Sequence, residues 1–283
     1  MAAFSADDPI TACLSIMRRM PPNKIEQNLS GLLNLVPDST DELLQRVDQP
    51  LEEGTCSASG KKYLMCDYNR DGDSYRSPWS NQYDPPLDDG FVPSEQLRNM
   101  EIQANELFDS YRELYFEGGT SSVYLWDLDG AGFAGCFLVK KSIESTGVVK
   151  AGSWNSIHVI EVSEQDGGKK ASYKLTTTVL LSADVDKPEC GSTDLSGSLT
   201  RQKARTCEIN AEHTHLSNMG EIIEDMETEM RSNMNALYVQ KTREIVNSIR
   251  SMATGPKQEA DFVNSLNAAV MAHGDTRTKD SES

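Results

Sequence analysis

The run from Asp67 to Asp73, DYNRDGD, carries the spacing of a calcium-binding loop. It matches the first half of an EF-hand loop, in which carboxylate and amide oxygens ligate the ion. Position twelve of such a loop must be a bidentate glutamate, but here it is Pro78, and a proline also prevents the exiting helix. We therefore expect a polar loop held by Asx turns and ring packing, and no calcium site.

The histidines and cysteines do not combine into a metal centre either. His213 and His215 offer two zinc ligands, yet no cysteine or third histidine lies near them in the sequence. His158 alternates with apolar neighbours and is expected to be a solvent-facing or satisfied strand residue. No two cysteines form a CxxC pair, and without a signal sequence we expect reduced thiols in the cytosol. The cysteines are Cys13, Cys56, Cys66, Cys136, Cys190 and Cys207. The sequence thus predicts no metal and no cofactor.

The motifs of common enzymes are missing or out of place. The sequence contains no GxxxxGK[ST] phosphate loop, no GxSxG nucleophile elbow and no HExxH zinc motif. The run GAGFAG at 130–135 has the letters of a GxGxxG motif, but Gly130 and Gly132 lie between two expected strands and indicate a turn. We predict no catalytic residue and no enzyme activity. The 27 Lys and Arg stand against 44 Asp and Glu, a net charge of −17, which disfavours binding to nucleic acids and to anionic membranes. No apolar stretch approaches the roughly 18 residues of a transmembrane helix, so we expect no membrane span.

The end of the chain offers the clearest lead to a function. Residues 257–273 show an amphipathic helical pattern behind a Gly-Pro break. Its apolar stripe consists of Phe262, Leu266, Ala269 and Val270. So short a helix is not stable alone, and it must bury this stripe on the body of the same chain or in a groove of a partner. Membrane-surface binding is disfavoured, because Lys257 stands against Glu259 and Asp261.

The elements that would support this segment begin with helices. Three short amphipathic helices, separated by prolines, are expected in residues 1–50 and should pack as a small stalk. Residues 51–93 contain a linker, a short strand candidate and a long loop. Four rings pin this loop, so we expect it to be ordered. They are Tyr68, Tyr75, Trp79 and Tyr83.

A sheet should follow. A helix is expected over 94–118, and five strands joined by short turns over 119–207, which predicts an antiparallel meander with helices on one face and water on the other. The expected strands are 120–128, 132–141, 154–163, 171–182 and 195–206. A long helix within 208–254 would cover the sheet, followed by the amphipathic segment 255–273 and a disordered tail, 274–283. The fold class is α+β.

Several runs together resemble the beta subunit of the heterodimeric F-actin capping protein family. The most specific run extends from Cys66 to Asn81, CDYNRDGDSYRSPWSN. The others occur in the order of the family and are MRRMPP at 17–22, VDQPL at 47–51, YFEGG at 115–119, SSVYLWD at 121–127, GSLTRQ at 197–202 and EDME at 224–227. The resemblance covers roughly residues 10–250.

This resemblance implies an obligate heterodimer with a similarly folded alpha subunit. Each subunit of the family contributes a helical stalk, a sheet that joins the partner's sheet, a long helix across it and a C-terminal tentacle. The dimer caps the barbed ends of actin filaments and blocks subunit exchange there, independently of calcium and without nucleotide or catalysis. A place in the cytoplasm and the cytoskeleton follows.

The resemblance also implies sites. The tentacle would bind actin through Phe262, Val263, Leu266, Ala269 and Val270, and Arg231 on the long helix would add a basic contact from the body. Glu229 stands where relatives carry lysine, and the tentacle lacks basic residues common in relatives. The positive field toward acidic actin should therefore come from the alpha subunit, or capping should be slower or more salt-sensitive.

Other partners are implied by the resemblance alone. These are ankyrin-repeat inhibitors, linear capping-protein-interaction peptides and acidic phosphoinositides. An alternative role is the structural cap of the actin-like minifilament in the dynein activator complex, and the tentacle residues do not separate this role from filament capping.

Overall fold

The computed structural model describes residues 9–130, 132–144, 149–187, 191–240, 243–250 and 263–264. The chain divides into two compact units, Met1–Met230 and Arg231–Ser283. Among the described residues, no helix is both long and apolar enough to cross a membrane.

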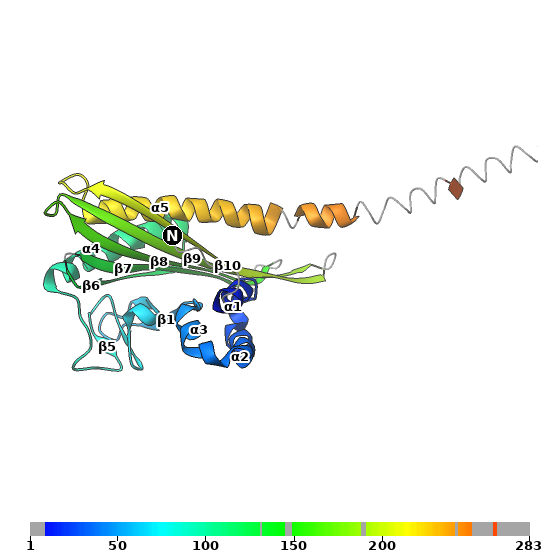
Figure 1. The fold of residues 1–283 in the computed structure, drawn as a ribbon, viewed down its shortest axis with the longest axis horizontal. Coiled ribbons are helices and arrows are strands. Elements are labelled where there is room, and N and C mark those ends of the chain that lie inside the picture. Colours follow the sequence, from blue (N-terminus) through cyan, green and yellow to red (C-terminus); the bar gives the residue numbers. More distant parts are fainter. Residues whose placement is uncertain are drawn as a thin grey trace, which may run out of the picture. The chain divides into compact units, whose positions relative to one another are not determined.

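A five-stranded antiparallel sheet forms the middle of the first unit (Figure 1). Its strands are β6 (Thr120–Asp127), β7 (Gly132–Glu144), β8 (Val149–Gln165), β9 (Lys170–Lys187) and β10 (Gly191–Glu208). The spatial order β10-β9-β8-β7-β6 follows the chain, as in a meander. The predicted combination of helices with a five-stranded antiparallel sheet is therefore confirmed.

The strands continue beyond the residues whose hydrophobic alternation predicted them. β8 and β10 each exceed their predicted ranges at both ends, and Gly191 at the start of β10 still pairs with Lys187 of β9. Backbone hydrogen bonds extend the ladder where side chains no longer alternate. The turn from β8 to β9 uses Gly167 and Gly168, whose φ angles of 64° and 84° would strain a larger residue.

Two helices cover one face of this sheet, α4 (Glu95–Tyr115) and the part of α5 (His215–Met234) up to Met230 (Figure 1). The side-chain amide of Asn105 brackets the backbone of Val123 on β6, accepting from its N–H at 2.8 Å and donating to its carbonyl at 2.9 Å. α5 buries a stripe at helical spacing: Met219, Ile222, Ile223, Met226 and Met230. These contacts fix both helices on the sheet.

The opposite face is covered as well, so the expectation that it faces water is wrong. It carries α1 (Pro9–Met17), α2 (Ile25–Leu35) and α3 (Thr40–Arg46), with short 3₁₀ turns at Pro22–Lys24 and Pro37–Ser39, and the hairpin of β1 (Glu52–Thr55) and β2 (Lys62–Met65) (Figure 1). Leu51 and Leu64 pack in one cluster with Tyr124, Cys136 and Leu138 of the sheet. Because both faces of β6 and β7 are buried, these strands are apolar on both sides.

The long loop between β2 and α4 carries structure of its own. A 3₁₀ turn, Asp67–Asn69, leads into a small antiparallel sheet of β3 (Arg70–Asp71), β4 (Ser74–Arg76) and β5 (Tyr83–Asp84). The ring of Tyr68 stacks on Trp126 of β6, with centroids 5.3 Å apart. Ring packing therefore ties this loop to the main sheet.

The second unit begins within the last turn of α5. A π-helical stretch, Asn235–Gln240, follows α5, and residues 243–250 are helical. Residues 241–242 and 251–262 lie outside the described residues, as does the predicted tail, 274–283.

Candidate functional site

The predicted apolar stripe falls mostly beyond the part of the chain that the structure describes. Phe262, Leu266, Ala269 and Val270 lie outside the described residues. Val263 lies in a described helical pair, 263–264, and has 51% of its surface exposed. An exposed valine on a helix is accessible to a second protein.

The predicted basic contact lies near the end of α5. Arg231 is half-buried there, whereas Glu229, two residues earlier, is exposed. Glu229 and Arg231 carry opposite charges, so together they add no net positive charge. This turn alone is therefore a weak site for an acidic surface.

The outer edge of β10 is open except where Ser198 meets Arg18. β10 pairs with β9 along all of its 18 residues, and no other strand in the described part of the chain pairs with it. The edge N–H of Ser198 donates to the carbonyl of Arg18 at 3.0 Å. A long strand with an open edge is a template for a strand of another chain. This edge is the candidate surface for a partner whose sheet continues this one.

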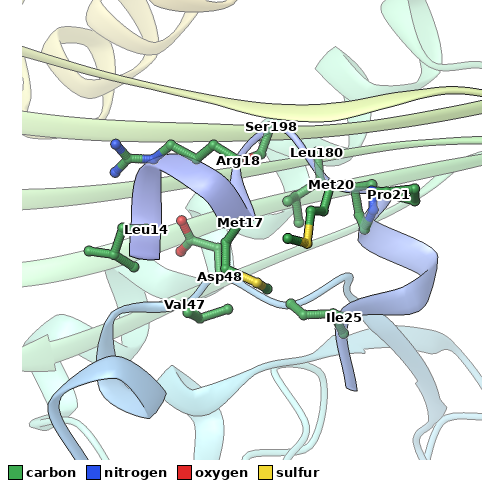
Figure 2. Close-up of a pocket in the computed structure, with 11 residues that line it drawn as sticks. Leu14, Met17, Arg18, Met20, Pro21, Ile25, Val47, Asp48, Leu180 and Ser198 are labelled. Atoms are coloured by element: carbon green, nitrogen blue, oxygen red, sulfur yellow. The ribbon is translucent and has the colours of Figure 1, made fainter. Parts of the chain in front are cut away.

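Figure 2 shows the junction beside that edge, where the N-terminal helices close over β9 and β10. A cavity of about 30 Å³ remains there, lined by Leu14, Met17, Arg18, Met20, Pro21, Pro22, Ile25, Val47, Asp48, Leu180 and Ser198. A single water molecule occupies about 30 Å³ in the liquid. The junction is therefore a packing contact that holds α1 at the strand edge, too small for an organic ligand.

The calcium-like run is used for folding. Asn69 is buried, and its side-chain amide donates to the carbonyl of Arg76 at 2.9 Å while its Oδ1 accepts from the N–H of Cys66 at 2.9 Å. This residue therefore has no oxygen directed at an ion. Within the described residues, no group of three histidine, cysteine or carboxylate side chains is arranged to hold a metal.

The histidine pair is divided between two environments. His213 is exposed, whereas Nδ1 of His215 lies 2.9 Å from the hydroxyl of Tyr173 and Nε2 lies 3.4 Å from Glu164. Burial lowers the pKa of His215, and the adjacent Glu164 opposes that shift in part. His215 thus links the start of α5 to the sheet.

The structure contains two buried polar clusters that the sequence did not predict. Glu101 of α4 accepts from Arg76 at 2.8 Å through both oxygens, and also from Arg98 and from the N–H of Leu125 at 2.7 Å. His158 of β8, expected only to be a satisfied or solvent-facing residue, is fully buried against Glu227 of α5. Only the polarity of these residues within apolar runs could have indicated them, since their partners are remote in sequence.

The chain is similar to known proteins over most of its length. A family model described as "F-actin capping protein, beta subunit" matches residues 10–246. Proteins named F-actin-capping protein subunit beta are similar to it. That of Caenorhabditis elegans is 48% identical over 270 residues, covering 95% of this chain and 99% of the relative, and that of Drosophila melanogaster is 49% identical over 260 residues, covering 91% and 94%.

A solved structure shares the fold. It is the homodimeric actin capping protein alpha subunit from Plasmodium berghei, with a TM-score of 0.51 and 14% sequence identity, and the match covers 85% of this chain and 95% of that one. At this identity the likeness concerns the fold alone.

Proposed function

The chain belongs to the family of F-actin capping protein beta subunits, and on that premise we propose that it caps the barbed ends of actin filaments and blocks subunit exchange there. The observation that carries this proposal is the family match over residues 10–246, together with relatives of that name at 48% identity over 95% of the chain. The relatives' names do not favour the alternative, a cap of the minifilament in the dynein activator complex. The proposed activity needs no catalytic residue, nucleotide or metal ion.

The working unit of this proposal is a heterodimer with an alpha subunit. The open edge of β10 supports it, because a partner of the same fold offers an equivalent edge and the two sheets join by main-chain hydrogen bonds. Without this partner the edge is an aggregation site. The chain expressed alone should therefore aggregate.

Capping itself is assigned to the C-terminal segment and the body together. The apolar stripe of Phe262, Val263, Leu266, Ala269 and Val270 fills a cleft on a terminal actin subunit. Burial of apolar surface is worth about 25 cal/mol per Å² before the cost of ordering the segment. Arg231 supplies a contact from the body, and the alpha subunit's own segment makes attachment multivalent and release slow.

The net negative charge of this chain indicates a further role for the alpha subunit. This chain carries a net charge of −17, and Glu229 precedes Arg231 closely. Since the proposed target is acidic, the alpha subunit should supply most of the attractive field. Ankyrin-repeat inhibitors, capping-protein-interaction peptides and phosphoinositides are the further partners of this proposal, and its place is the cytoplasm and the cytoskeleton.

The test is filament growth from seeds in the presence of the chain co-expressed with its alpha subunit. Nanomolar heterodimer should stop elongation at barbed ends. Unchanged barbed-end growth at that concentration would contradict the proposed function.

A matched pair of variants tests the stripe. Phe262→Asp with Leu266→Asp places two charges on it and should weaken capping, whereas Asn264→Asp with Asn267→Asp adds the same charge elsewhere on the segment and should leave capping intact. Equal capping by both variants would refute the role of the stripe without touching the family assignment.

A further inference from the structure

Two cysteines meet on the sheet face that carries the β1–β2 hairpin. Cys136 lies in β7 and is fully buried in the cluster that contains Leu64 and Tyr124. Cys66, directly after β2, packs against this same cluster. Cα atoms of β2 lie within 8 Å of Cα atoms of β7, and the Cys66 thiol lies near enough to that of Cys136 to raise its pKa. The spacing of these cysteines in the sequence gave no sign of this contact.

The two thiols differ in access. Cys66 is half-buried and lines an open hollow of about 360 Å³ together with Asp67 and Arg70, so a small polar oxidant can approach this residue from solvent. The Sγ atom of Cys66 also accepts from the backbone N–H of Asn69. Cys136 has no exposed surface. Oxidation should therefore begin at Cys66.

The environment of Cys136 keeps its thiol protonated. Burial raises its pKa well above the usual value, and the neighbouring Cys66 thiol raises it further. A protonated, inaccessible thiol does not react with peroxide from solution, but it can react with an oxidised sulfur beside it if its proton passes to the departing hydroxide.

We propose that Cys66 and Cys136 are a redox pair that hydrogen peroxide converts into a disulfide between the end of β2 and β7. The Cys66 thiolate attacks one peroxide oxygen, the O–O bond breaks, and after protonation a sulfenic acid and one water remain. The Cys136 sulfur then attacks the Cys66 sulfur. Hydroxide leaves and takes the Cys136 proton as a second water. In total, two thiols lose two electrons to one peroxide, which yields one disulfide and two waters.

The bond would fasten the β1–β2 hairpin to the sheet. It closes a long chain segment, so it restricts the unfolded chain, and the oxidised protein should unfold at a higher urea concentration than the reduced protein. This chemistry does not require the proposed capping activity.

The experiment uses the full chain purified with its partner subunit and exposed to increasing hydrogen peroxide. Remaining thiols are blocked by alkylation, and the digest is analysed by mass spectrometry without reduction. We expect one linked peptide pair, joining Cys66 to Cys136, with the loss of two hydrogens and of two free thiols per chain. Dithiothreitol should reverse it.

Variants separate the pair from general oxidation. Cys136→Val keeps an apolar side chain in β7 and should leave Cys66 as a sulfenic acid that a dimedone probe traps. Cys207→Ser removes another half-buried thiol and should leave the linked pair unchanged. The proposal is overturned if the unaltered chain forms no such link while Cys66 oxidises further, or if Cys66 links to another cysteine. Both outcomes are read from the unaltered protein, whether or not a variant folds.

Discussion

Oε1 of Glu227 on α5 lies 2.9 Å from Nε2 of His158 on β8, and neither side chain has exposed surface. The other ring nitrogen of His158 lies 2.9 Å from Oγ1 of Thr177 on β9. A chain of polar contacts thus runs from α5 to two neighbouring strands of the sheet. Because apolar contacts tolerate small rotations of a helix and hydrogen bonds do not, this chain specifies how α5 sits on the strands.

Removing one member of this pair should destabilise the protein. Glu227→Ala leaves the buried ring of His158 without this partner, and we expect a loss of about 2 kcal/mol in the free energy of unfolding. The double variant His158→Leu with Glu227→Leu replaces both polar groups. It should lose less stability than the summed losses of the single variants His158→Leu and Glu227→Leu. Urea unfolding of the heterodimer measures the cycle, and additive losses would contradict an energetic coupling.

Removing the carboxylate of Glu101 should cost more stability than removing that of Glu227. Glu101 is fully buried and holds Arg76 at 2.8 Å through both oxygens. Glu101→Ala leaves a buried guanidinium uncompensated, so we expect a loss of about 3–5 kcal/mol. Glu106→Ala, at an exposed position of the same helix, serves as the control and should change stability by less than about 0.5 kcal/mol. Similar losses in the two variants would argue against the ionic network.

His215 should make stability depend on pH. Burial, opposed in part by Glu164, lowers its pKa in the folded state below the ordinary value of 6.5. Between these two pKa values the unfolded chain binds more protons, so the free energy of unfolding rises with pH. The stabilisation that depends on neutral His215 is complete above the pKa of this residue in the unfolded chain. It is lost as the pH falls through its pKa in the folded protein.

The measurement is urea unfolding from about pH 5 to about pH 8, with His215→Gln as the variant. This change also removes the contact with Tyr173, so the slope with pH carries the test and the absolute stability does not. If the free energy of unfolding rises equally with pH in the variant and in the unaltered protein, His215 is not the group that causes the pH dependence.

Two glycine substitutions should act in opposite directions. A Cβ on Gly132 in β7 would overlap the carbonyl oxygen of Val162 in β8, so Gly132→Ala should cost about 1–3 kcal/mol. A Cβ on Gly31 within α2 would meet nothing within 4 Å, so Gly31→Ala should stabilise the helix by about 0.5–1 kcal/mol. Thermal unfolding of the heterodimer distinguishes them, and a neutral Gly132→Ala would show that the strand can shift to make room.

Hydrophobic alternation and turn residues were sufficient to predict the meander. The strands β7 to β10 each contain their predicted range, β6 covers its range except for Leu128, and Gly130 marks a turn with a φ of 97°. The run from Cys66 to Asn81 was sufficient to identify the family that the comparisons show. These features are readable in sequence because period and local backbone conformation depend on residues that are close along the chain.

Contacts between remote residues were decided by the tertiary structure. Glu101 lies 25 residues from Arg76, and Glu227 lies 69 residues from His158, so no local pattern could pair them. The covering of the second sheet face by Leu51 and Leu64 was likewise missed, because alternation reports that a side is apolar and not what buries it. The sequence by itself determined the main helices and the five strands of the large sheet in their order, whereas β1 fell in a predicted linker and β3, β4 and β5 fell in a predicted loop. Packing alone decided which faces close on each other, since burial of a polar group is tolerated only where a distant partner completes its hydrogen bonds.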